Sequence, residues 1–206
     1  MKKSIVGKVS LILLFCFSIF LVVPPVTQAG EATNQVKETV DEVINILNIK
    51  ELKSPEKEKE RREKIRAVIE KRFDFAEMAR RALSIHWKQR TPEEQKEFVS
   101  LFSDLLEDTY IRKIEKFENE KVQYIGERME GNYATVRTQI VNPQGGIETP
   151  VDYRIFKQGD KWEVYDIIVE GVSLVNNYRT QFNQIIRSSS YGELVKRLKK
   201  KTIKET

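Results

Sequence analysis

Residues 151–156 (VDYRIF) and 161–170 (KWEVYDIIVE) are two short segments rich in β-branched and aromatic residues, and residues 170–186 (EGVSLVNNYRTQFNQII) follow them directly. Alternating side chains and the Gly159-Asp160 turn predict that the first two segments pair as antiparallel strands. The third segment has apolar residues three or four positions apart, which predicts an amphipathic helix. We therefore expect a sheet with a helix laid against it, enclosing a pocket suited to an apolar ligand.

Two more alternating segments precede this pair. The predicted strands are residues 121–128, 133–141, 147–156 and 161–169. Short connections rich in glycine join them, so we expect an antiparallel meander. Pro150 cannot donate to a strand ladder and is predicted at an edge or a bulge. Alternation places Val151 and Tyr153 on one face and Asp152 on the other, and because both faces keep apolar members, we expect both to be covered.

Helical periodicity fills the rest of the chain. Apolar stripes predict a helix over residues 31–49, a second that begins within the charged run 50–64 and continues to 73, and others over 73–83, 91–117, 172–188 and 191–201. Asp74 is a suitable N-cap for the third of these. Thr91, Pro92 and Glu94 form a strong helix start, with the spacing of a capping box. The predicted fold class is α+β: a single antiparallel sheet of about four strands wrapped by amphipathic helices, with a hydrophobic cavity between sheet and helices.

The first 29 residues resemble a secretory signal peptide. Lys2, Lys3 and Lys8 precede an apolar run over residues 9–23, and Ala29 ends the segment. The run is shorter than the ~20 residues that a membrane-spanning helix needs. Cleavage after Ala29 would leave residues 30–206 as a single domain with a basic C-terminal tail. That mature chain would hold no cysteine, so it would reach an oxidising compartment without disulfides.

Composition excludes several functions. The net charge is +5, and three of the lysines lie in the predicted leader, so nucleic acid is not an expected partner. The single histidine, His86, and the single cysteine, Cys16, leave no basis for a metal site or a thiol nucleophile. No glycine-rich phosphate loop is present, so no cofactor is predicted. The tail lysines (Lys196, Lys199, Lys200, Lys201 and Lys204, with Arg197) indicate a solvated helix face or contact with anionic lipid head groups.

Two alternatives to a binding protein stay open. Asp152 and Asp166 neighbour Tyr153 and Tyr165, and a buried Asp–Tyr pair could act on a carbonyl substrate in a cone-shaped α+β enzyme. Strand alternation argues against this pair, because Asp152 points away from Tyr153, and favours ion pairs with arginine. The other alternative is a protein without a cavity, whose basic tail docks on a membrane surface.

The order of several separated motifs resembles the MlaC family, also called toluene-tolerance auxiliary proteins. The motifs are FDFAEMARRAL (73–83), HW (86–87), TPEEQ (91–95), TPVDYR (149–154), WEVYDIIVEGVSLV (162–175), NYR (177–179) and QF (181–182). The resemblance extends from about Glu31 to Lys201. It implies a helix-wrapped antiparallel sheet that buries phospholipid acyl chains and leaves the head group outside.

The resemblance also implies a role and a site. Such a protein carries phospholipid through the periplasm between an outer-membrane lipoprotein complex and an inner-membrane complex of an MCE-domain ring, a permease and an ATPase. By position in the motifs, Tyr110, Val151 and Val172 are expected to line the lipid cavity. Periodicity adds Leu106, Tyr153 and Val175. The apolar stripe further adds Met78, Leu105 and Tyr178.

Overall fold

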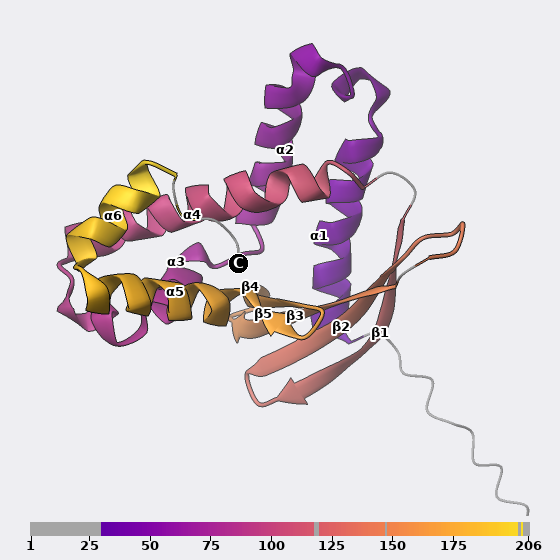
Figure 1. Cartoon of the computed structure of the whole chain (residues 1–206). Helices are drawn as coiled ribbons and strands as arrows, with labels where there is room; N and C mark the ends of the chain where they lie inside the picture. Colours follow the sequence, from indigo (N-terminus) through magenta and orange to yellow (C-terminus); the bar gives the residue numbers. More distant parts are fainter. Residues whose placement is uncertain (1–29, 118–119, 147, 202, 204–206) are drawn as a thin grey trace, which may run out of the picture.

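The computed structural model describes residues 30–117, 120–146, 148–201 and 203. In this part of the chain six α-helices pack with one antiparallel sheet of five strands, which confirms the predicted α+β class (Figure 1). The helices are α1 (Glu31–Asn48), α2 (Glu58–Glu70), α3 (Phe75–Leu83), α4 (Pro92–Ile114), α5 (Leu174–Ser188) and α6 (Tyr191–Lys199). The strands are β1 (Lys121–Glu130), β2 (Tyr133–Val141), β3 (Thr149–Gln158), β4 (Lys161–Val169) and β5 (Val172–Ser173). The predicted leader lies outside the described residues.

The sheet follows chain order, β1-β2-β3-β4-β5, with every neighbouring pair antiparallel. The meander is thus confirmed, with one strand more than the four predicted. Val172 and Ser173, which were expected to begin a helix, instead pair with Val169 and Ile168. The cause is the tight turn before them: Glu170 and Gly171 both have positive φ (51° and 82°), which returns the chain onto β4 before the helix begins.

Pro150 lies neither at a sheet edge nor at a bulge. It is the second residue of β3, a central strand, and pairs with Gln139 of β2. A proline is tolerated near the start of a strand, where few ladder bonds depend on its nitrogen. Its carbonyl oxygen accepts a hydrogen bond from the Glu170 nitrogen at 3.0 Å, so the residue still contributes to holding the β4–β5 turn.

The predicted helix starts are confirmed. Asp74 caps α3 by accepting a hydrogen bond from the Glu77 nitrogen. Thr91 and Glu94 form the complete capping box of α4, with Pro92 as its first residue. These local contacts fix the direction in which α3 and α4 leave their preceding turns. Among the helices of the described residues, none has the length and hydropathy that a membrane span requires.

Three apolar clusters hold the molecule together. One lies among α3, α4, α5 and α6, and we call it the helical core. A second joins α1 to the inner face of the sheet, and a third lies where α1 and α2 meet the end of α4. In Figure 1 the α1–α2 hairpin stands over the sheet, α4 crosses the hairpin, and α3, α5 and α6 gather on the left of the view. The sheet-side clusters and the helical core therefore occupy different ends of one molecule.

The outer face of the sheet is only partly covered, so the expected cover on both faces is wrong for most of it. Among the described residues on that face, only Asp166 is buried. Tyr133, Phe156 and Tyr165 form an aromatic group there, and the Arg81 guanidinium of α3 lies 4.0 Å from the centre of the Tyr165 ring. The aromatic residues that suggested a second buried face therefore pack against one another and against an arginine side chain.

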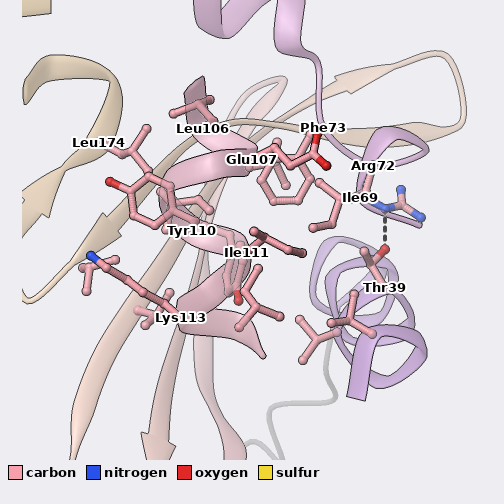
Figure 2. A pocket seen from close by; sticks show the side chains of 18 of the residues that line it. Thr39, Ile69, Arg72, Phe73, Leu106, Glu107, Tyr110, Ile111, Lys113 and Leu174 are labelled. Atoms are coloured by element: carbon pink, nitrogen blue, oxygen red, sulfur yellow. Dashed lines mark hydrogen bonds between the residues drawn. The ribbon is translucent and has the colours of Figure 1, made fainter. Parts of the chain in front are cut away.

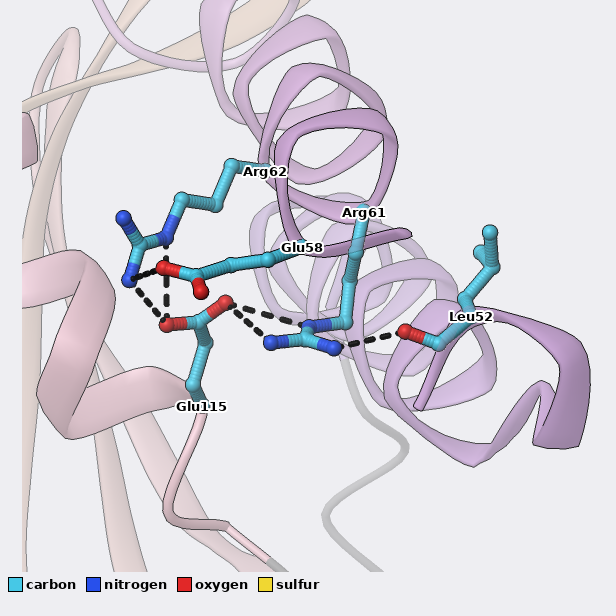
Figure 3. A network of polar contacts seen from close by, with 5 residues as sticks. All are labelled: Leu52, Glu58, Arg61, Arg62 and Glu115. Carbon is cyan, nitrogen blue, oxygen red and sulfur yellow. Dashed lines mark hydrogen bonds and ion pairs between the residues drawn. The ribbon is translucent and has the colours of Figure 1, made fainter. Parts of the chain in front are cut away.

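A polar clamp fastens α2 to the end of α4 (Figure 3). The Glu115 carboxylate accepts hydrogen bonds from Arg61 at 2.7 Å and from Arg62 at 2.8 Å. Arg61 also donates to the Leu52 carbonyl oxygen at 2.6 Å. Burial alone would raise the pKa of Glu115, but the hydrogen bonds from the two arginines outweigh it and hold that pKa below its usual value. The clamp therefore binds the α1–α2 hairpin to the C-terminal end of α4.

Candidate functional site

A cavity of about 580 Å³ lies between the inner face of the sheet and the helices α1, α2 and α4 (Figure 2). Its volume is in the range of small-molecule binding sites. The α1 wall is an aliphatic stripe of Val36, Val40, Val43, Ile44 and Leu47. The sheet contributes Val122, Ile140, Val151, Tyr153, Val164, Ile167 and Val169, whose side chains share the inner face. The second half of α4 completes the enclosure.

Three charged groups that border the cavity have partners within the protein. Arg66 lies 2.8 Å from the Glu107 carboxylate, and Arg72 donates to the Thr39 hydroxyl at 3.1 Å and to the Trp162 carbonyl oxygen at 2.8 Å. Burial raises the pKa of Glu107 and lowers the pKa of Arg72. Burial likewise raises the pKa of Tyr153 to about 12, so its phenol stays uncharged. The interior surface is thus largely apolar, and these three charged groups are ion-paired or hydrogen-bonded within the protein.

The exposed lining residues mark the mouth of the cavity. Val172 on β5 is 60% exposed although it borders the cavity, and Lys113 and Glu170 are also exposed. At the other end, Val164 and Met78 are completely or almost completely buried. Figure 2 places Lys113 and Phe73 on opposite sides of the cavity. The site therefore has an apolar interior and a rim that carries charges of both signs.

Six of the nine predicted site residues border this cavity. They are Met78, Leu106, Tyr110, Val151, Tyr153 and Val172. The other three, Leu105, Val175 and Tyr178, lie in the helical core and do not line the cavity. Leu105 precedes Leu106 by one position and points about 100° away from it around the helix. Tyr178 stacks edge-to-face against Phe102, with ring centres 5.4 Å apart.

The α1 stripe is the part of the lining that the sequence-based prediction missed. Its apolar periodicity is visible in the sequence, but the same pattern describes a helix packed on a solid core. Phe117, just beyond α4, and Phe73 and Phe75, at the start of α3, were missed for the same reason. The periodicity identifies which face of a helix points inward. It does not identify whether other side chains fill the space opposite.

The Asp–Tyr pairs do not form a catalytic site. Asp152 and Tyr153 lie on opposite faces of β3, and only Tyr153 borders the cavity. Asp166 accepts hydrogen bonds from the Ser173 hydroxyl at 2.6 Å and from the Val175 nitrogen at 3.0 Å, and Arg154 lies 3.3 Å away. Its role is to tie the start of α5 to β4. Within the described residues, no group of three or more His, Cys, Asp or Glu side chains is arranged to hold a metal ion.

Most of the basic C-terminal residues have acidic partners in the protein. Lys199 lies 2.7 Å from Glu97 and Lys201 lies 2.5 Å from Asp108, both on α4. Lys196 and Arg197 both pair with Glu193 within α6. Lys204 lies outside the described residues. The pairs of Lys199 and Lys201 attach the basic segment to α4, which favours the solvated helix face over a lipid-contacting tail.

Comparison with known proteins finds a matching family and several relatives, among them the two that follow. Residues 37–200 match the family model described as MlaC protein. The intermembrane phospholipid transport system binding protein MlaC of Haemophilus influenzae is 24% identical over 123 residues, a match that covers 57% of this chain and 57% of that protein. The chain thus matches little more than half the length of this relative. A phospholipid-binding protein from Ralstonia solanacearum, solved in complex with a phospholipid, is 28% identical with a TM-score of 0.72, and the match covers 83% of this chain and 96% of that one.

Proposed function

This chain belongs to the MlaC family, and on that premise we propose that it is a periplasmic phospholipid carrier and not an enzyme. One observation carries the proposal: a cavity of about 580 Å³ with an aliphatic lining occurs in the fold that, in the Ralstonia protein, was solved with a phospholipid. The acyl chains would occupy the space between the sheet and α1, α2 and α4. The head group would lie at the mouth, beside Lys113, Glu170 and Val172.

The energetics explain why such a carrier is needed. Two acyl chains contain ~30 methylenes, and their exposure to water costs roughly 24 kcal/mol. A lipid cannot cross an aqueous compartment alone at that cost. A dry aliphatic cavity resembles the bilayer interior, so loading and unloading are both close to balanced. A lining made of valine and isoleucine side chains offers no hydrogen bonds that would select one acyl chain over another.

The proposal extends to the rest of the route. Residues 1–29 would direct the chain across the inner membrane and be removed after Ala29. The partners would be an outer-membrane lipoprotein complex and an inner-membrane complex of an MCE-domain ring, a permease and an ATPase, as the family resemblance implies. Nucleotide hydrolysis would then belong to the partner, and the bound phospholipid would be cargo and not a cofactor.

Lipid extraction after a charge substitution tests the proposal. Val151 is 7% exposed and faces the cavity, so Val151→Glu would place a carboxylate against the acyl chains. We expect this variant to lose at least nine-tenths of the phospholipid that co-purifies with the wild type. Val172→Glu, at the exposed mouth, should lose less. The measurement is mass spectrometry of organic extracts from protein purified under native conditions.

Ile125→Glu is the matched control, because Ile125 lies on β1, is 53% exposed and does not border the cavity. It should retain the wild-type amount of lipid. Circular dichroism establishes that each variant is folded. A folded Val151→Glu protein with full lipid occupancy, or a wild-type protein that carries no phospholipid, would overturn the proposal.

A further inference from the structure

A second hollow lies behind the cavity, on the other side of Phe73 and Phe75. It is a surface groove bordered by α3, the first half of α4 and the end of α2, and its lining includes Trp87, Lys96 and Val99. Four residues border both spaces: Arg66, Phe73, Phe75 and Ser103. We call these four residues the end wall. The two phenylalanines supply its apolar part, because Arg66 and Ser103 are polar.

The end wall is held rigidly by the backbone. The segment before α3 bonds to β4 from both sides of Phe73: the Val164 nitrogen donates to the Arg72 carbonyl oxygen at 2.8 Å, and the Asp74 nitrogen donates to the Val164 carbonyl oxygen at 3.0 Å. Phe75 follows the Asp74 cap as the first residue of α3. The two rings are stacked, with centres 6.0 Å apart and planes 25° apart. These contacts fix the backbone positions from which the two rings project.

The end wall and the mouth lie at opposite ends of the cavity. Phe73 bridges to Val164, whereas Val172 at the mouth pairs with Val169 of the same strand. Val164 and Val169 are five positions apart on β4, a distance of roughly 16 Å at the usual rise per residue. An acyl chain that enters at the mouth meets the phenylalanine rings as its methyl end reaches the closed end.

We propose that Phe73 and Phe75 set the longest acyl chain that the protein carries, an inference that rests on the proposed carrier function. A chain too long for the cavity must leave methylenes in water at the mouth. Each such methylene weakens binding roughly fourfold. The groove beyond the wall offers no dry continuation, because Glu70, Asp74 and Lys96 border it. The affinity for a lipid therefore falls once its acyl chain is longer than the space that ends at the end wall.

Substitutions at Phe75 test this in both directions. Phe75→Ala would open space at the closed end and favour longer chains, and Phe75→Trp would shorten the cavity and favour shorter ones. The delipidated proteins are incubated with vesicles that contain equal amounts of phosphatidylglycerols with successive even-numbered acyl chains, from lauroyl to arachidoyl. Bound lipid is extracted and resolved by mass spectrometry. For Phe75→Ala we expect the ratio of the longest to the shortest bound lipid to rise at least fourfold, and for Phe75→Trp we expect it to fall.

Val99→Ala is the matched control, since Val99 borders the groove and not the cavity; its chain-length profile should equal that of the wild type. Phe75→Leu makes the same test with a smaller change if the alanine variant does not fold. Folded Phe75 variants that bind lipid with the wild-type profile would overturn this inference and leave the carrier function standing. A wild-type protein that takes up no lipid from any vesicle would overturn the carrier function itself, and this inference with it.

Discussion

The helical core and the cavity are built from similar apolar stripes, yet one is solid and the other hollow. In the helical core, Phe98, Phe102, Tyr178 and Phe182 are all fully buried, and their rings meet edge-to-face or stacked at 5.4–6.0 Å. The cavity walls of α1 and the sheet instead consist mostly of valine and isoleucine. Large rings fill the space between the helices of the helical core. The short branched side chains of α1 and of the inner sheet face do not reach one another, and they leave the cavity between them.

Helix α4 belongs to both regions and shows how one element serves each. Its first half contributes Phe98 and Phe102 to the helical core, and its second half contributes Leu106, Tyr110 and Ile114 to the cavity. Beyond the cavity, Ile111 near the end of α4 packs against α1 and α2, and the clamp at Glu115 adds polar contacts to α2. The helical core therefore holds in place the same helix, α4, whose second half lines the cavity.

The largest effect should come from removing a ring in the helical core. Phe102 is completely buried and contacts the rings of Phe98, Tyr178 and Phe182. Phe102→Ala should lower the free energy of unfolding by about 3–5 kcal/mol, because the ring leaves a cavity that the surrounding helices cannot fill. Urea denaturation measures the change from the shift in midpoint at constant slope.

Val40→Ala is the counterpart at the hollow end. Val40 borders the cavity and is only half-buried, so its truncation should cost about 1 kcal/mol or less. If the two substitutions destabilised the protein equally, the sheet side would have to be a packed core as well, and the contrast between the two regions would fail.

Breaking the clamp that closes the hollow end should have an intermediate effect. Glu115→Gln removes the charge that pairs with Arg61 and Arg62, whose side chains are 15% and 31% exposed. We expect a loss of about 2 kcal/mol, below the usual cost of breaking a fully buried pair because part of the clamp reaches solvent. Urea denaturation at neutral pH gives the value.

The clamp also predicts a pH dependence with a definite sign. The folded protein holds the pKa of Glu115 below its ordinary value, so the clamp's contribution is complete above pH 4.5 and is lost as the pH falls through the lower, folded pKa. The difference in stability between wild type and Glu115→Gln should therefore shrink as the pH is lowered below 4.5. A difference that stayed constant over that range would contradict the assignment.

The sequence was sufficient for elements whose determinants are local. Thr91 and Glu94 predict their capping box because the contact spans three residues, and alternation located β2 and β4 to the residue. The clamp was not predictable, because Arg61 and Glu115 are 54 positions apart and each is ordinary on a charged helix. The β5 strand was missed because it depends on two positive-φ residues in a turn, one of them a glutamate.

The site was predictable in part for the same reason. Strand alternation placed Val151 and Tyr153 on the inner face, and that face borders the cavity. Adjacent helical residues were harder: Leu105 and Leu106 are both buried in the helical core, and only Leu106 also borders the cavity. Whether an inward face meets another side chain or an empty space depends on the distance between elements, which no periodicity encodes. The contact of these residues with lipid stays a prediction.

The smallest effect should come from Glu107, which borders the cavity opposite the α1 stripe. Burial raises its pKa despite the nearby Arg66, so the fold favours the protonated form. Its ionisation at neutral pH therefore costs stability, and that cost disappears as the pH falls below 4.5, where the carboxyl is protonated in both the folded and the unfolded state. Glu107→Gln should change the free energy of unfolding by less than about 1 kcal/mol at neutral pH, in the stabilising direction, because Arg66 keeps Asp104 at 3.1 Å and Glu70 at 3.0 Å as partners. Denaturation at neutral pH and at pH below 4.5 should show that small gain in stability only at the higher pH.

A substantial loss of stability at neutral pH would contradict this prediction. It would mean that the Arg66–Glu107 pair, like the clamp at Glu115, fastens the helices around the cavity, and that two ionic contacts close the cavity instead of one.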